Sequence, residues 1–226
     1  MAAGAAAHVF VADLEHPRLD EPDRHHLERV LRLRAGEEVT ASDGAGGWRR
    51  CRFVAGATLE PHGEIEVVPR PTPVVTVAFA LTKGERPEWT VQKLAEAGVD
   101  RIVPMTTART VVRWDGEKGA RQVTRLRAVV RAAAMQSRQV WLPLVNDLQP
   151  FVSLAQGGGV ALAQMGGDPP SLERPSILIG PEGGWDEAEL AVSLPRVTLG
   201  PTVLRAETAA MAAGLFLCGL RAGVVN

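Results

Sequence analysis

Apolar runs alternate with helical patterns through the last two thirds of the chain, and this alternation restricts the fold more than any other feature of the sequence. Strand-length apolar runs occur at VVTVAFAL (74–81), VDRIVPM (99–105), WLPLV (141–145), GVALAQM (159–165), SILIG (176–180) and RVTLG (196–200). Helical patterns lie between them, from Pro87 to Gly98 and over 118–136, 150–156, 186–194 and 206–220. Apolar strands alternating with helices indicate a mostly parallel sheet covered on both faces, so we predict an α/β fold.

The first 70 residues have a different pattern. Short β segments at 8–14 and 63–69 flank a helical stretch at 23–33. The turn Asp43–Gly47, rich in glycine and set between two alternating runs, predicts a β-hairpin. The segment Pro69-Arg70-Pro71-Thr72-Pro73 is typical of a stiff linker. We therefore predict two domains, 1–70 and 74–226.

Composition excludes several classes of protein. With 226 residues, 46% of them hydrophobic, the chain can bury a sizeable core, and a net charge of -1 shows no global basic character. The two cysteines, Cys51 and Cys218, lie far apart, which argues against a zinc site or a disulfide scaffold, and we expect no metal. The start of the chain lacks the pattern of a secretory signal, and no run of about 18 apolar residues occurs, so we expect a cytoplasmic protein without membrane contact.

The stretch ILIGPEGGWDEAEL (177–190) places a glycine-rich turn between a strand and a helix. Such a turn can hold phosphate, but a P-loop needs a lysine, and no lysine follows Lys118. The spacing of Gly180, Gly183 and Gly184 does not fit a dinucleotide fingerprint either, which disfavours a nucleotide-dependent oxidoreductase. We expect instead a neutral or cationic ligand held by backbone groups.

A second turn of similar character follows in VTLGPTVLRAETAAMAAG (197–214). Gly180-Pro181 and Gly200-Pro201 each end a predicted strand. On neighbouring strands of one sheet, the two turns would meet at its carboxyl edge, where α/β proteins bind ligands. The structural alternative is that both glycines only terminate strands.

Together, ILIGPEGGWDEAEL and LGPTVLRAETAAMAA resemble the ribosomal RNA small subunit methyltransferase E family, the uridine-N3 methyltransferases of 16S rRNA in the SPOUT superfamily. The resemblance extends to HHLERVLRLRAGEEV and LTKGERPEWTVQKLAEAGVDRIVPMTTARTVVRW, and so to nearly the whole chain. It implies an S-adenosylmethionine-dependent enzyme that methylates N3 of a specific uridine in 16S rRNA or in the assembled small subunit. It also implies a small PUA-like β-barrel that positions RNA, a SPOUT-type domain with a trefoil knot, and a homodimer.

The resemblance also implies which residues form the cofactor pocket. They come from the ends of three predicted strands and the segments that follow: Leu162, Ala163, Gln164, Gly180, Pro181, Glu182, Gly183, Gly184, Leu199, Gly200, Leu204, Arg205 and Thr208. For catalysis, Arg205 is the candidate to stabilise the uracil anion. Glu207 or Glu182 is the candidate proton acceptor, since no histidine follows His62. The structural alternatives are that Glu207 serves only the helix dipole and that Glu182 only braces its loop.

Basic residues concentrate between Arg101 and Trp141, where nine stand against two acidic ones. Phosphate neutralisation is a natural use for such a patch, and a solvated helix face is the alternative. The predicted RNA-binding residues are Arg29, Arg32, Arg34, Arg49, Arg109, Arg113, Arg121, Arg125 and Arg138. We expect His25 and His26 on the surface, because adjacent helical residues point apart.

Two other functions fit the same motifs. A related knotted enzyme could methylate the ribose 2'-hydroxyl of RNA, and a non-catalytic ribosome-assembly factor could keep the fold and bind RNA. Identification of the modified nucleoside distinguishes the first, and measurement of cofactor binding the second.

Overall fold

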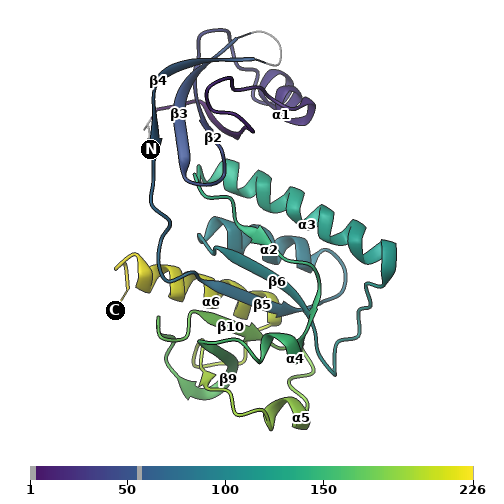
Figure 1. Ribbon diagram of the computed structural model, residues 1–226. Coiled ribbons are helices and arrows are strands. Elements are labelled where there is room, and N and C mark those ends of the chain that lie inside the picture. The colour runs from purple at the N-terminus through teal and green to yellow at the C-terminus, as the bar shows by residue number, and fades with distance from the viewer. Residues whose placement is uncertain (1–3, 55–57, 226) are drawn as a thin grey trace. The chain divides into compact units, whose positions relative to one another are not determined.

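The computed structural model describes residues 4–54 and 58–225 (Figure 1). The chain divides into two compact units, the first formed by Met1–Arg70 and Ala134–Leu142 and the second by Pro71–Ala133 and Pro143–Asn226. Residues 134–142 therefore belong to the first unit, although the division drawn from the sequence put them in the second domain. Residues 1–3, 55–57 and 226 of the two predicted domains lie outside the described residues.

The first unit contains a four-stranded sheet of order β1-β2-β3-β4. Its strands are β1 (Ala7–Phe10), β2 (Glu38–Ser42), β3 (Gly47–Phe53) and β4 (Leu59–Val67). Strand β1 runs parallel to β2, and the other pairs are antiparallel, with the predicted hairpin turn joining β2 to β3. The predicted helix at 23–33 is the short α1 (Glu21–His25), continued by the π-helical η1 (His26–Val30), and both histidines are exposed.

Residues 134–142 are built into the first unit by hydrogen bonds to three parts of it. The ring of His8 bonds the carbonyl of Gln139 at 2.9 Å, and the hydroxyl of Ser42 donates to the carbonyl of Val140, also at 2.9 Å. The indole of Trp141 donates to the carbonyl of Val68 at 3.0 Å. Polar groups that would otherwise be buried without partners are satisfied in this way.

The second unit contains a parallel sheet of order β11-β9-β10-β5-β6-β7, with β8 also paired to β6. Its strands are β5 (Thr76–Ala80), β6 (Arg101–Thr106), β7 (Leu144–Val145), β8 (Gln149–Pro150), β9 (Val160–Asp168), β10 (Ser176–Ile179) and β11 (Arg196–Val197). The predicted α/β fold with a parallel sheet is confirmed. The two-residue strand β8 was not expected from the sequence.

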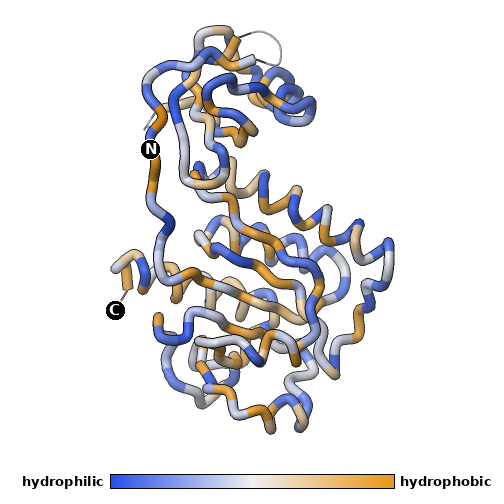
Figure 2. The backbone as a smooth tube through the Cα atoms, viewed as in Figure 1, coloured by the Kyte–Doolittle hydropathy of each residue, from blue (hydrophilic) through white to orange (hydrophobic). Residues whose placement is uncertain are grey.

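Helices cover both faces of this sheet. Alternate residues of each strand point to opposite faces, so a single strand contributes to two core clusters. Val77 and Phe79 of β5 belong to a core cluster with α2 (Arg86–Glu96), α3 (Gly116–Gln136) and α6 (Ala206–Arg221). Ala78 and Ala80 belong to a second cluster with α4 (Phe151–Leu154) and α5 (Glu187–Leu190). The apolar colouring along β5 and β6 in Figure 2 reflects this burial on both sides.

Helix α5 is much shorter than the predicted helix over 186–194. It begins with a capping box, in which Asp186 accepts from the backbone and Glu189 bonds back to the N-cap amide, and it ends at Leu190. Pro195 disfavours helical conformation in the residue before it, and the β-branched Val192 adds little helix propensity. The apolar pattern therefore continues further than the helix.

Helix α6 lies close to α2. A side chain at Gly214 would meet the side chains of Val99 and Leu94 at 2.9 and 3.0 Å, so only glycine permits this approach. At the other end of α6, Arg221 forms a buried ion pair with Asp100 and also donates to the carbonyl of Gly98 at 2.9 Å. Among the described residues, no helix has both the length and the apolar character needed to cross a membrane.

Candidate functional site

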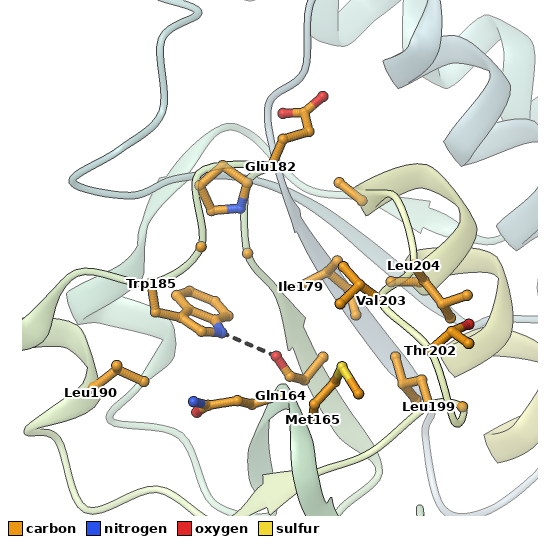
Figure 3. Close-up of a pocket in the computed structure, with 17 residues that line it drawn as sticks. Gln164, Met165, Ile179, Glu182, Trp185, Leu190, Leu199, Thr202, Val203 and Leu204 are labelled. Atoms are coloured by element: carbon orange, nitrogen blue, oxygen red, sulfur yellow. Dashed lines mark hydrogen bonds between the residues drawn. The ribbon is translucent and has the colours of Figure 1, made fainter.

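A cavity of about 340 Å³ opens where three segments of the second unit meet (Figure 3). The first segment is the stretch of β9 around Gln164, the second is the glycine turn after β10, and the third links β11 to α6. All three lie at the carboxyl ends of parallel strands or just beyond, which is the usual ligand site of such sheets. The two Gly-Pro turns found in the sequence thus line one cavity.

The two turns do not, however, follow neighbouring strands. Strand β9 lies between β10 and β11 and pairs with both of them. The expectation that these strands are adjacent was therefore wrong, because chain order does not give the order of strands in a sheet. The intervening strand instead adds its own wall, with Ala163 and Gln164, between the two turns.

Trp185 forms the inner side of the glycine turn. Its indole donates to the carbonyl of Ala163 at 3.1 Å, and its ring packs against Phe151 at a centroid distance of 5.5 Å. A side chain at Gly180 would meet this ring at 3.0 Å, so glycine lets the turn close over the indole. The tryptophan therefore fixes the turn to β9 from below.

The cavity walls suit a ligand without phosphate. Apolar side chains such as Ile179, Leu199 and Leu204 form much of the lining, and no lysine, arginine or histidine of the described chain is part of it. The charged lining residue is Glu182, an acid. Gln164 also lines the cavity, and its buried amide oxygen has no hydrogen-bond partner among the described residues.

Most of the predicted pocket residues line the cavity, and four do not. Those that line it are Ala163, Gln164, Gly180, Pro181, Glu182, Gly184, Leu199, Gly200 and Leu204. Leu162 is fully buried in the core cluster beneath the site. Gly183 and Arg205 are exposed and Thr208 is half-buried, and all three stand beside lining residues in the sequence.

The cavity has further lining residues that were not predicted from the sequence: Met165, Ile179, Trp185, Leu190, Thr202, Val203, Ala206 and Ala209. Trp185 directly follows the GPEGG stretch, so a large aromatic residue ending a glycine turn was a usable signal. Ala206 and Ala209 lie three residues apart on α6, which is the spacing of one helix face. Nothing in their identity as alanines points to a ligand.

The three predicted catalytic residues differ in burial. Arg205 is exposed, and it is the N-cap residue of α6. Glu182 is 47% exposed, and its carboxylate points away from the cavity in Figure 3, 2.6 Å from the guanidinium of Arg86. Glu207, in the first turn of α6, is only 15% exposed and lies 3.9 Å from the same guanidinium.

The arginines of the second unit that were predicted to bind RNA differ in their contacts. Arg113 and Arg121 are exposed, and the buried positions Val123 and Leu126 lie on the opposite side of α3 from Arg121. Arg125 is also exposed, but it pairs with Glu88 at 2.9 Å. Arg109 donates to the carbonyl of Gly183 at 2.9 Å, so its side chain contacts the glycine turn itself.

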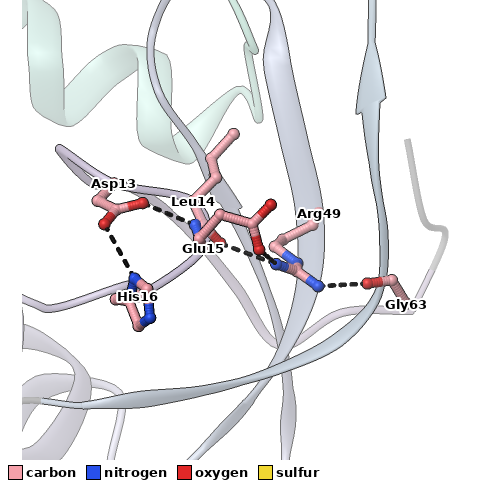
Figure 4. A network of polar contacts seen from close by, with 6 residues as sticks. All are labelled: Asp13, Leu14, Glu15, His16, Arg49 and Gly63. Atoms are coloured by element: carbon pink, nitrogen blue, oxygen red, sulfur yellow. Dashed lines mark hydrogen bonds and ion pairs between the residues drawn. The ribbon is translucent and has the colours of Figure 1, made fainter.

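In the first unit, Arg29, Arg32 and Arg34 are exposed, whereas Arg49 is not. The guanidinium of Arg49 donates to the carbonyls of Leu14 and Gly63, at 3.0 and 2.5 Å, and lies 3.3 Å from Glu15 (Figure 4). Arg138 donates to the carbonyl of Ala5 at 2.5 Å. These contacts within the unit occupy donors that RNA phosphates would need.

Comparisons with known proteins agree with this arrangement. A family model described as an RNA methyltransferase domain matches residues 69–217, and one described as an RNA methyltransferase PUA domain matches residues 19–57. A protein of Mycobacterium bovis named ribosomal RNA small subunit methyltransferase E is 34% identical, over 86% of this chain and 83% of its own length. One of the same name from Bacillus subtilis is 29% identical, over 82% of each chain.

Solved structures give the same result. The ribosomal RNA small subunit methyltransferase E of Neisseria gonorrhoeae, bound to S-adenosyl methionine, matches with a TM-score of 0.81 and 27% identity, over 95% of this chain and 97% of that one. A probable rRNA-methyltransferase from Porphyromonas gingivalis matches with a TM-score of 0.80 and 25% identity, over 97% and 100%. From its sequence and its fold, the chain belongs to the ribosomal RNA small subunit methyltransferase E family.

Proposed function

We propose that this protein is an S-adenosylmethionine-dependent methyltransferase that methylates N3 of a uridine in 16S rRNA. The observation that supports this most is the cavity, because both sequence motifs of the family resemblance contribute walls to it. The relatives are named for action on small-subunit rRNA, and the Neisseria gonorrhoeae enzyme binds S-adenosyl methionine. The uridine N3 specificity comes from the family resemblance.

The residues present fit this cofactor. Its adenine would lie between apolar walls, with backbone groups of the two turns to read its edge, and its sulfonium is a cation. A lining without basic side chains suits a cation better than a phosphate. The unpartnered amide oxygen of Gln164 offers a further acceptor. When bound, the cofactor supplies an electrophilic methyl group.

The chain itself must bind the uracil, remove the N3 proton and exclude water. In our proposal, Arg205 stabilises the negative charge that develops on the uracil, and a carboxylate, Glu207 or Glu182, accepts the proton. The apolar walls keep bulk water from the reacting atoms, which strengthens these charge interactions. The exposed arginines Arg113 and Arg121 of the second unit, and Arg29 of the first, would contact RNA phosphates.

Two structural features of the family are also part of the proposal. The first is a trefoil knot in the segments that form the cavity, and the second is a homodimer. Exposed apolar residues on α6 and after it support the dimer: Leu215, Phe216, Val224 and Val225. They adjoin a smaller hollow of about 270 Å³ that includes Phe216 and Leu220.

Mapping of the modified nucleoside tests the function directly. Ribosomal RNA from cells with and without the gene would be digested and the methylated nucleosides identified by mass spectrometry. We expect 3-methyluridine in 16S rRNA only when the gene is present. Loss of a ribose-methylated nucleoside instead would identify the enzyme as a 2'-O-methyltransferase, and an unchanged profile would favour a non-catalytic factor.

Two substitutions test the assignment of the site. Gly200→Val should abolish cofactor binding in calorimetry. The protein should stay folded, because the nearest side-chain atom, on Leu204, lies 3.9 Å from a new Cβ. Arg205→Ala should keep the cofactor dissociation constant within a few-fold and remove methylation. If Gly200→Val retains full affinity, the turn is not part of the cofactor site.

A further inference from the structure

Arg86 joins the two walls of the candidate site. It is the first residue of α2, and its guanidinium lies 2.6 Å from Glu182, in the turn after β10, and 3.9 Å from Glu207, in the first turn of α6. Arg86 belongs to the LTKGERPEW stretch of the sequence, which contains none of the predicted site residues. It is therefore the side chain that ties together both candidate proton acceptors.

The two carboxylates are not equivalent. Glu182 is 47% exposed, so solvent weakens its interaction with Arg86. Glu207 is 15% exposed, and its Oε2 atom is buried without a hydrogen-bond partner among the described residues. A buried carboxylate oxygen without a donor is costly and therefore unusual in a purely structural position.

Glu207 lies next to the cavity wall in the sequence, and its carboxylate is held as the anion. It follows Ala206, which lines the cavity, and it comes two residues after Arg205. Its negative charge is stabilised by Arg86 on Oε1 and by the N-terminus of α6. One oxygen thus lies within ion-pair distance of a cation, and the other is buried without a partner among the described residues.

We propose that Arg86 is a positioning residue, which orients the Glu207 carboxylate as the proton acceptor of the reaction; this inference rests on the proposed function. In the step, the N3–H bond of uracil breaks, the proton goes to Oε2 of Glu207, and the electron pair stays on N3. That pair would then form a bond to the cofactor's methyl carbon as the carbon–sulfur bond breaks, and the electrons of the broken bond would stay on sulfur. Arg86 contacts neither the uracil nor the methyl group.

Steady-state kinetics of the full-length enzyme on 16S rRNA or the small subunit, together with calorimetry of S-adenosylmethionine, test the proposal. Glu207→Gln should lower kcat by roughly a hundredfold or more, in the range of general-base catalysis. Arg86→Ala should lower kcat by about tenfold or more, with the cofactor dissociation constant within about threefold. Arg86→Lys should restore part of kcat, since it keeps the charge but not the planar geometry. Arg86→Ala added to Glu207→Gln should cause no further loss of kcat.

Two control variants separate this role from others. Lys93→Ala removes a cation from the same helix, where Lys93 pairs with Glu96 at 2.7 Å, and should leave kcat unchanged. Glu182→Gln breaks the other ion pair of Arg86 and should lower kcat less than Arg86→Ala does. The proposal is overturned if Glu182→Gln reproduces the full loss, if the double variant shows multiplied losses, or if Arg86→Ala abolishes cofactor binding. A wild-type product other than 3-methyluridine would overturn the proposed function separately.

Discussion

At the scale of single residues, His8 is a buried polar side chain with a hydrogen-bond partner for each ring nitrogen. Its side chain is 4% exposed. One ring nitrogen donates to the carbonyl of Gln139 and the other accepts from the hydroxyl of Thr40, at 2.9 and 2.8 Å. Burial lowers the pKa of His8 from 6.5 to about 4, so the imidazole is neutral at physiological pH.

This residue predicts a pH dependence of stability. Between pH 6.5 and about 4 the unfolded chain binds a proton at His8 and the folded chain does not, so stability is full above pH 6.5 and falls as the pH is lowered. From pH 7 to pH 5 the free energy of unfolding should fall by about 2 kcal/mol through this group. Urea unfolding of wild type and His8→Gln at both pH values measures it.

The His8→Gln variant should lose this part of the pH dependence, whatever its absolute stability. An identical decrease in both proteins would mean that His8 stays neutral in the unfolded chain as well, or that it is solvated in the folded protein. The comparison of slopes is therefore more informative than either stability alone.

At the scale of elements, the glycine turn after β10 is held from outside by the segment after β6. Arg109 donates to the carbonyl of Gly183, and the backbone amide of Ala108 donates to the buried carboxylate of Glu189 at 2.8 Å. The second oxygen of Glu189 accepts from Asp186, at the start of α5. Hydrogen bonds thus connect the turn, α5 and the 106–110 segment to one another beside the cavity.

Arg109→Ala should therefore act on the cofactor more than on RNA. Without the guanidinium, the carbonyl of Gly183 loses its donor and the turn gains freedom, so we expect the S-adenosylmethionine dissociation constant to rise several-fold. In a filter-binding assay, RNA affinity should change by less than about twofold, because at most one exposed phosphate contact is lost at moderate salt. The opposite pattern, weaker RNA binding with unchanged cofactor affinity, would restore the role predicted from the sequence. Arg113→Ala, in the same stretch between β6 and α3, is the matched control.

Elements with strong local patterns were predictable, and their spatial order was not. Helices α2, α3 and α6 follow from apolar periodicity, because local propensity and tertiary packing agree there. The sequence also revealed both glycine turns of the cavity. It did not reveal Arg86 as a bridge, since that role depends on contacts between distant segments. Arg49 shows the same limit, because a buried arginine and an RNA-binding one are identical in sequence.

At the scale of the whole molecule, the end of α6 carries an apolar surface that a second copy of the chain would cover. Phe216→Glu should convert the proposed dimer into a monomer, because a charge at a buried interface is costly to desolvate. Sedimentation at micromolar concentration measures this change. Val152→Glu, at an exposed apolar position on α4, is the matched control and should not change the sedimentation of the wild type. A monomeric wild-type protein would contradict the proposal.

Residues 134–142 also constrain how the protein can be made. They complete the first unit, yet they are synthesised after β5, α2 and β6 of the second. Domains usually fold in turn as they leave the ribosome, the first before the next. Here the hydrogen bonds of Gln139, Val140 and Trp141 to the first unit can form only after that part of the chain has emerged. The amino-terminal unit can therefore complete these contacts only after residues 71–133 of the second unit have been translated.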